Sequence, residues 1–82
     1  MATTKTYTTT FTKADLDSEQ NLIHTYIGGL LIPNPLYAVI QYQVSNMPSF
    51  VIGLRKNSDA QVTVNCSECP SGTHVISIIY KS

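Results

Sequence analysis

Apolar and polar residues alternate along much of this chain, and the stretch from 36 to 44 shows the pattern most clearly. This stretch is rich in β-branched and aromatic residues, which suit a pleated, half-buried surface. One parity is apolar throughout, and its members are Leu36, Ala38, Ile40, Tyr42 and Val44. The other parity is apolar at Tyr37 and Val39 and polar from Gln41 onward. The pattern predicts a central strand, near the middle of a sheet.

Further strands are predicted from the same alternation, at 22–27, 50–54, 61–66 and 73–81. The last of these segments is apolar on both parities, so we expect it to be central as well. Turn-forming residues separate the segments at 28–29, 33–35, 45–48, 57–59 and 70–72. We expect Pro33-Asn34-Pro35 to stay outside the sheet, because proline lacks the N–H that a sheet ladder needs. Within 61–66, the inward positions are predicted to be Val62, Val64 and Cys66.

Residues 1–12 are dominated by threonine, and they predict either an edge strand or an arm that reaches onto a neighbouring molecule. Threonine favours extended structure, and Tyr7, Thr9 and Phe11 share one parity, which would face inward. The segment has little apolar mass of its own, so both alternatives stay open. Residues 13–21 are too short and too weakly periodic for a stable helix, and we predict a loop there.

Strands separated by short turns, with no clear helix, predict an all-β fold. We expect a small antiparallel β-sandwich of about six strands, formed by residues 13–82, with a small barrel as the alternative. The 82 residues are enough for one domain. A domain of this size has a marginal core, so we expect association with another protein to add to its stability.

The charge of the chain argues against two classes of function. Five Lys and Arg balance five Asp and Glu, and only 12% of the residues are charged. Nucleic-acid binding needs clustered cations, and the only adjacent pair here is Arg55-Lys56. A membrane-surface role needs a basic amphipathic helix, which the pattern does not predict. A weakly charged surface favours association with other proteins instead.

No segment is predicted to enter a membrane. The longest apolar run, 26–32, is interrupted by two glycines and is too short to span a bilayer. The amino terminus has no apolar signal core. We therefore expect the protein to be made in a cytoplasm and to leave it only by cell lysis.

Cys66 and Cys69 form a CxxC pair, which is the main candidate for metal or redox chemistry. A structural zinc site needs four ligands, and His24 and His74 are the histidines that would complete it. Both histidines lie in predicted strands and lack the close spacing of a zinc motif. A redox CxxC normally precedes a helix, whereas Pro70 follows here. We expect no metal, no cofactor and two reduced cysteines, Cys66 buried and Cys69 in a loop, with a local disulfide as the alternative in an oxidising medium.

The sequence does not predict an enzyme. Asp15, Asp17 and Glu19 resemble paired carboxylates, but they are neighbours on one predicted loop, whereas a glycosidase holds two carboxylates across a cleft. No serine or cysteine has a recognisable activating partner. His24 and His74 lie on predicted apolar faces, where a histidine is usually a core residue.

Several short motifs, taken in order, resemble those of a known family. They are F-T-K-A-D-L at 11–16, a strand with His24 that runs into Gly28, Y-A-V-I-Q-Y at 37–42, S-D-A-Q-V-T-V at 58–64 and S-G-T-H-V-I at 71–76. Together they resemble the small β-sandwich domains of tailed-bacteriophage virion proteins, which occur at tail-fibre ends and in other appended structural proteins. The resemblance covers residues 11–80. Three residues separate His24 from Gly28, one more than in the family pattern.

The resemblance implies a structural protein without chemistry of its own. We expect a capsid decoration (cement) protein or a fibre-type subunit, which acts in the virion as a homotrimer and contacts major capsid or tail proteins. Its amino-terminal segment would supply the contact residues Tyr7, Thr9 and Phe11. The alternative is a receptor-binding module of a tail fibre that recognises host-surface carbohydrate through the loops 30–35 and 45–49. Its ligand residues would be Leu30, Leu31, Asn34, Asn46 and Met47.

Overall fold

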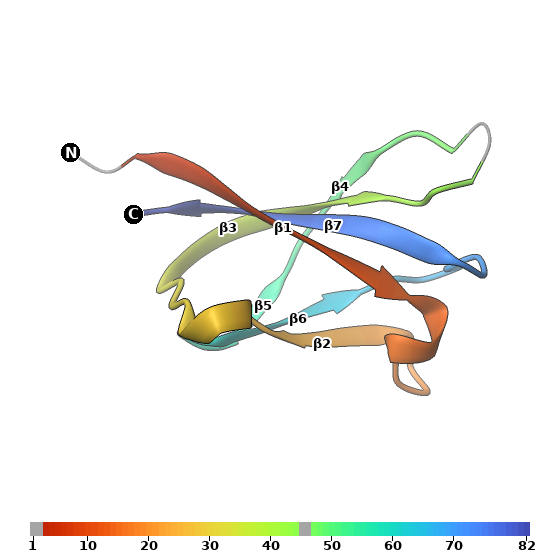
Figure 1. Cartoon of the computed structure of the whole chain (residues 1–82), viewed down its shortest axis with the longest axis horizontal. Coiled ribbons are helices and arrows are strands. Elements are labelled where there is room, and N and C mark those ends of the chain that lie inside the picture. Colours follow the sequence, from red (N-terminus) through yellow and green to blue (C-terminus); the bar gives the residue numbers. More distant parts are fainter. Residues whose placement is uncertain (1–2, 45–46) are drawn as a thin grey trace.

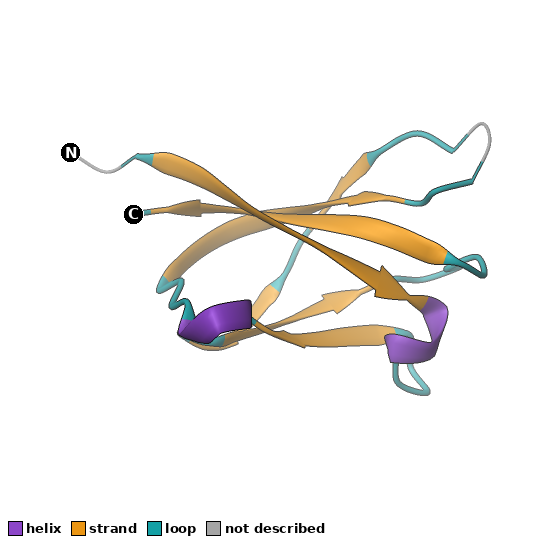
Figure 2. Ribbon diagram, viewed as in Figure 1, coloured by secondary structure: helices purple, strands orange, loops and turns teal. Residues whose placement is uncertain are grey.

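The computed structural model describes residues 3–44 and 47–82, which form two antiparallel β-sheets packed face to face (Figure 1, Figure 2). The large sheet has the order β1-β7-β3-β4, with β1 at Thr4–Thr12, β7 at Thr73–Lys81, β3 at Asn34–Gln41 and β4 at Phe50–Ile52. The small sheet has the order β2-β6-β5, with β2 at Asn21–Thr25, β6 at Gln61–Asn65 and β5 at Arg55–Ser58. Two 3-10 helices follow β1 and β2, namely η1 at Lys13–Asp15 and η2 at Ile27–Gly29. The predicted small all-β fold is confirmed.

The core lies between the two sheets and takes alternate residues from their strands. In the large sheet β7 lies between β1 and β3, which is the central position that its two apolar parities predicted. Its inward parity places His74, Ile76 and Ile78 in the core, each no more than 1% exposed. In the small sheet β6 is central and buries Val62 and Val64. The inward positions predicted for 61–66 and the central position predicted for 73–81 are confirmed.

The start of β3 differs from the prediction. The strand begins at Asn34, and Pro35 pairs with β7, so the expectation that the Pro-Asn-Pro segment stays outside the sheet was wrong. Proline is tolerated at the beginning of a strand and beside a bulge. Both conditions hold here, because the register with β7 shifts between Pro35 and Tyr37. The shift removes Leu36 from the inward stripe, and its side chain is 46% exposed.

The segment predicted as one strand at 50–54 is divided between the two sheets. β4 ends at Ile52 in the large sheet, and β5 begins at Arg55 in the small sheet. Gly53 and Leu54 therefore cross from one layer to the other. Ile52 and Leu54 still pack against the core, as their shared parity predicted.

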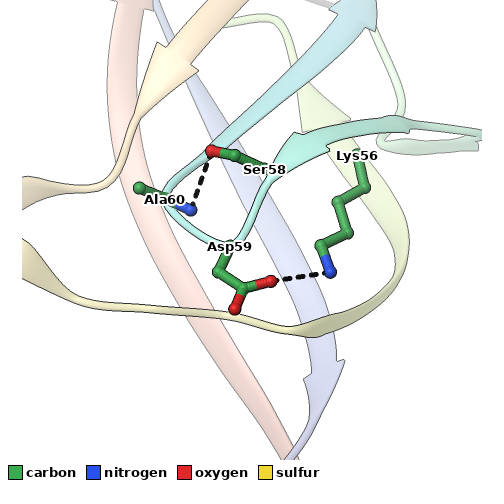
Figure 3. A network of polar contacts seen from close by, with 4 residues as sticks. All are labelled: Lys56, Ser58, Asp59 and Ala60. Atoms are coloured by element: carbon green, nitrogen blue, oxygen red, sulfur yellow. Dashed lines mark hydrogen bonds and ion pairs between the residues drawn. The ribbon is translucent and has the colours of Figure 1, made fainter.

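The turn after β5 begins later than predicted, because Asn57 and Ser58 belong to the strand. The Ser58 hydroxyl accepts a hydrogen bond from the Ala60 N–H at 3.1 Å, which closes the turn (Figure 3). Lys56 Nζ lies 2.7 Å from Asp59 Oδ1 in the same turn. Both side chains are substantially exposed, so this ion pair contributes at most about 1 kcal/mol.

The described part of the threonine-rich segment is an edge strand of the large sheet. β1 pairs with β7 of the same chain along its whole length, without a register shift. Phe11 is buried in the core, and Tyr7 packs against it. The loop predicted at 13–21 contains one helical turn, η1, before β2 begins.

Candidate functional site

The structure does not bring the four candidate zinc ligands together. Cys66 and Cys69 are free thiols in the turn between β6 and β7, close to the start of the strand that carries His74. His24 lies on β2 and is bonded to Tyr7 of β1 instead. Within residues 3–44 and 47–82, no three His, Cys, Asp or Glu side chains are grouped so that they could hold a metal ion.

Both ring nitrogens of His74 are occupied by the backbone. The Gln43 N–H donates to Nδ1 at 2.9 Å, so the ring proton is on Nε2, which donates to the Pro70 carbonyl at 2.8 Å. The ring packs edge-on against Tyr42, with 4.9 Å between the ring centroids. His74 of β7 thus joins the segment after β3 to the turn between β6 and β7, which is the core role that its apolar face predicted.

The two cysteines are buried and therefore weakly nucleophilic. Cys66 is 1% exposed and Cys69 is 4% exposed. Burial raises the pKa of the Cys66 thiol to about 12, and it also raises the pKa of Cys69. The thiolate is the form that attacks a disulfide or binds a metal. At neutral pH these thiols stay protonated, so they suit core packing better than redox chemistry.

A second aromatic cluster closes the seam where the edge of the large sheet meets the edge of the small sheet. Tyr7 Oη lies 2.9 Å from His24 Nε2, and it accepts a hydrogen bond from the Ile27 N–H at 3.1 Å. The Tyr7 and Tyr26 rings meet edge to face at 5.1 Å. Burial lowers the pKa of His24 and raises the pKa of Tyr26 to about 12. These shifts keep both groups uncharged at neutral pH, which suits a packed seam.

The three candidate carboxylates belong to the loop structure around η1. Asp15 Oδ2 accepts the Thr12 N–H at 2.7 Å. Asp17 Oδ1 accepts the N–H groups of Asn21 at 2.9 Å and Glu19 at 2.8 Å, and these bonds lower the pKa of Asp17. All three carboxylates are on an exposed loop, and none faces another across a cleft. Their arrangement is the solvated turn that their spacing predicted.

The predicted ligand loops lie at opposite ends of the sandwich, because β3 runs between them (Figure 1). Leu31 is 59% exposed at one end, and Met47 is 39% exposed at the other. Leu30 is also exposed, Asn34 is the first residue of β3, and Asn46 is outside the described residues. An eight-residue strand spans about 26 Å, so one small ligand cannot contact both loops.

The predicted contact residues of the amino-terminal segment face the core. Phe11 is 3% exposed, and Tyr7 and Thr9 are partly buried. The structure therefore does not leave Phe11 accessible to another protein. The opposite parity of β1, which is entirely threonine from Thr4 to Thr12, is the one that faces away from the core.

The feature that the sequence interpretation missed is the outer face of the large sheet. We define this outer face by the central residues that point away from the core: Thr6, Thr8, Thr10, Tyr37, Val39, Gln41, Val51, Val75, Ser77 and Ile79. The same parity of β7 ends at Lys81, which lies outside this face at one end of the sheet. None of these ten residues is charged, and five of them are apolar or aromatic. Val51 is 66% exposed and Tyr37 is 38% exposed. The signal was present as apolar residues on both parities of β3 and β7, which were interpreted only as a sign of a central position.

Comparison of the chain with known protein families, with characterised proteins and with solved structures finds no match. Within the described residues, no helix has the length and apolar character needed to cross a bilayer. The geometry of the chain itself therefore carries the functional argument.

Proposed function

We propose that this protein is a structural subunit of a tailed-phage virion, a capsid decoration (cement) or fibre-type protein that stabilises the particle through protein–protein contacts. The observation that carries the proposal is the uncharged, largely apolar outer face of the large sheet. The resemblance of the sequence motifs to virion β-sandwich domains supplies the class of particle and the trimeric association.

An antiparallel sheet with one face in water normally alternates apolar inward and polar outward residues. The outer face departs from this rule at Val39, Val51 and Ile79, which lie in neighbouring rows of the sheet. Covering such side chains gains about 25 cal/mol per Å² of apolar surface. No ion has to lose its water in the contact, because the outer face carries no charge. The surface is therefore suited to contact with another protein.

The area of the outer face fits a contact that is repeated many times rather than one tight pair. Four strands spaced about 4.8 Å apart, with three to nine residues at about 3.3 Å each, give roughly 300–600 Å² in projection. Two such faces together reach at most the lower limit of about 1,200 Å² for specific interfaces. Pairwise contacts of this size are weak, and they become effective when many copies bind one lattice.

The free edge of β1 adds a second kind of contact. It is nine residues long, without proline or bulge, and Lys5 is its one charge. Edges of this type are templates for pairing with a strand of another chain. A capsid or tail protein, or a second copy of this chain, would extend the large sheet there. The receptor-binding alternative has less support, because Leu31 and Met47 lie at opposite ends of the sandwich.

The test compares wild type with Val51→Lys, which places a charge on the exposed apolar residue that edge strand β4 contributes to the outer face. Ile23→Lys is the matched control, because Ile23 is 53% exposed on the small sheet. Light scattering up to roughly 1 mM protein is expected to show concentration-dependent association of wild type and Ile23→Lys, and its loss in Val51→Lys.

A second measurement addresses the particle. Phage particles that lack the protein are melted alone, with added wild type and with added Val51→Lys. We expect wild type to raise the melting temperature and Val51→Lys to raise it less. Identical melting curves in all three samples would contradict the cement role. In the light-scattering test, equal association of all variants would show that the outer face is not the contact surface.

A further inference from the structure

The small sheet carries an open pocket of about 280 Å³ on its outer side. The pocket arises because β5 stays beside β6 only as far as Arg55, which pairs with Thr63. Gly53 and Leu54 then leave for β4 in the large sheet, so the space beside the end of β6 stays open. The wall is formed by Asn21, Gly53, Leu54, Arg55, Thr63 and Asn65.

The polar side chains of the pocket are held in place by bonds to each other and to their neighbours. Asn65 Nδ2 donates to Asn21 Oδ1 at 3.0 Å and to the Glu19 carbonyl at 3.1 Å. Thr63 is 7% exposed, and its hydroxyl oxygen accepts a hydrogen bond from Asn57 Nδ2 at 2.6 Å. Side chains that are ordered before a ligand arrives lose little conformational entropy when it binds.

Arg55 supplies the charge of this pocket. Its guanidinium forms no ion pair within residues 3–44 and 47–82, where the ion pair found is between Lys56 and Asp59. Neither acidic side chain of the adjoining loop, Asp17 or Glu19, is part of the wall, and the Asp17 carboxylate accepts hydrogen bonds from the backbone N–H groups of Asn21 and Glu19. The pocket thus combines an unpaired guanidinium with amide and hydroxyl groups.

We propose that this pocket binds an acidic sugar, with the sugar carboxylate on Arg55. A guanidinium forms two parallel hydrogen bonds to a carboxylate, which is the strongest pairing open to this side chain. Both Nδ2 hydrogens of Asn65 are engaged by Asn21 and Glu19, so the groups that remain for sugar hydroxyls are the Asn21 amide and the Thr63 hydroxyl, each of which can donate and accept. Leu54 offers an apolar surface to the C–H groups of the sugar ring.

The size of the pocket limits the ligand to about one sugar unit, since sites for drug-sized ligands begin near 300 Å³. The inference goes beyond the proposed assembly role and does not depend on it. The pocket is on the outer side of the small sheet, and the contact surface is on the outer side of the large sheet, so each can fail without the other.

The test titrates the ¹⁵N-labelled full chain with glucuronate and follows the amide and side-chain resonances by NMR. Glucose is the uncharged counterpart with the same ring, and N-acetylglutamate presents a carboxylate on a peptide-like group. We expect saturable shifts around Arg55, Thr63 and Asn65 with glucuronate, and binding at least about tenfold weaker with both other probes. The proposal is overturned by equal binding of glucose. Equal binding of N-acetylglutamate overturns the assignment to a sugar.

Two neighbouring residues provide matched variants, because Arg55 lines the pocket and Lys56 does not. Arg55→Gln and Lys56→Gln remove the same charge, and only the first is expected to weaken glucuronate binding, by about tenfold or more. Arg55→Lys keeps the charge but loses the planar fork, so its affinity should fall between wild type and Arg55→Gln. Thermal melting checks that each variant is folded, and Arg55→Lys decides the question if Arg55→Gln does not fold. Equal losses in Arg55→Gln and Lys56→Gln overturn the site.

Discussion

Two tyrosine hydroxyls at the seam between the sheets differ in their hydrogen bonding. The Tyr7 hydroxyl contacts His24 Nε2 and the Ile27 N–H, whereas the Tyr26 hydroxyl is buried and has no partner among the described residues. The rings are in contact with each other, so both are in nearly the same surroundings. Burial of a hydroxyl without a partner has a desolvation free-energy cost, and no hydrogen bond offsets it. The pair therefore allows one group to be tested against the other.

Tyr7→Phe is expected to destabilise the protein by about 1–2 kcal/mol, because it leaves the Ile27 N–H and His24 without their partner. Tyr26→Phe is the control and is expected to be neutral or stabilising by up to about 1 kcal/mol. Urea denaturation of the three proteins gives the free energies of unfolding. Equal losses in both variants would mean that ring packing, and not the hydroxyl bonds, holds this seam.

The amino-acid pattern predicted both tyrosines in strands. Tyr7 lies in β1, whereas Tyr26 follows the end of β2 at Thr25, and both rings pack at the seam. The pattern could not predict which hydroxyl is bonded, because that depends on how the edges of two separate sheets align. The same limit applies to Cys69, whose loop position was predicted and whose burial was not. Burial of a loop residue depends on what folds over it, here the Tyr42 and His74 end of the large sheet.

At the scale of the element, the turn after β2 depends on glycine conformation. Gly28 has φ of 75° within η2, in the left-handed region where a side chain is strained. Gly53 lies in the crossing between β4 and β5 without a positive φ, and an added Cβ meets nothing there within 4 Å. The two glycines therefore differ in backbone strain and not in the space around them, because Gly28 is also open.

Gly28→Ala is expected to lower the free energy of unfolding by about 1 kcal/mol, because alanine resists the left-handed conformation. Gly53→Ala should be neutral or raise it by up to about 1 kcal/mol, because it restricts only the unfolded chain. Both substitutions reduce unfolded-state freedom equally, so the difference between their urea midpoints measures the strain. A stabilised Gly28→Ala variant would show that the turn adjusts its backbone without cost.

The alternation predicted β3, β6 and β7 well, because each has one parity committed to the core. It failed where a strand changes partner or register. Pro35 and Leu36 sit at the bulge of β3, and the 50–54 segment keeps one apolar parity while it passes from one sheet to the other. A period of two reports which side a residue faces, but not which sheet covers that side. The candidate ligand site was wrong for another reason, because loops 30–35 and 45–49 were grouped although the strand predicted between them places them at opposite ends of the sandwich.

At the scale of the whole molecule, the sandwich presents two unlike outer faces. The large sheet shows valine, isoleucine and threonine, whereas the small sheet shows amides, hydroxyls and Arg55, with Ile23 as an exposed apolar residue among them. The sequence alone could not predict the composition of either face. It does not say which strands share a sheet, and this decides which outward residues become neighbours. The zero net charge of the chain therefore does not reveal that one outer face is more apolar and the other more polar.

This division predicts how association responds to salt. Contacts through the uncharged outer face are not screened, and salt strengthens apolar burial, so wild type should associate at least as well at 1 M NaCl as at about 0.05 M. Light scattering at both salt concentrations measures this, with Val51→Lys expected to stay dissociated in each. Contacts through Arg55 or the lysines would instead weaken, because at 1 M salt the screening length is about 3 Å. Association that disappears at high salt would therefore move the contact from the uncharged outer face to the charged residues, which are Arg55 and Lys56 on the small sheet and Lys5 and Lys81 at the rim of the large one.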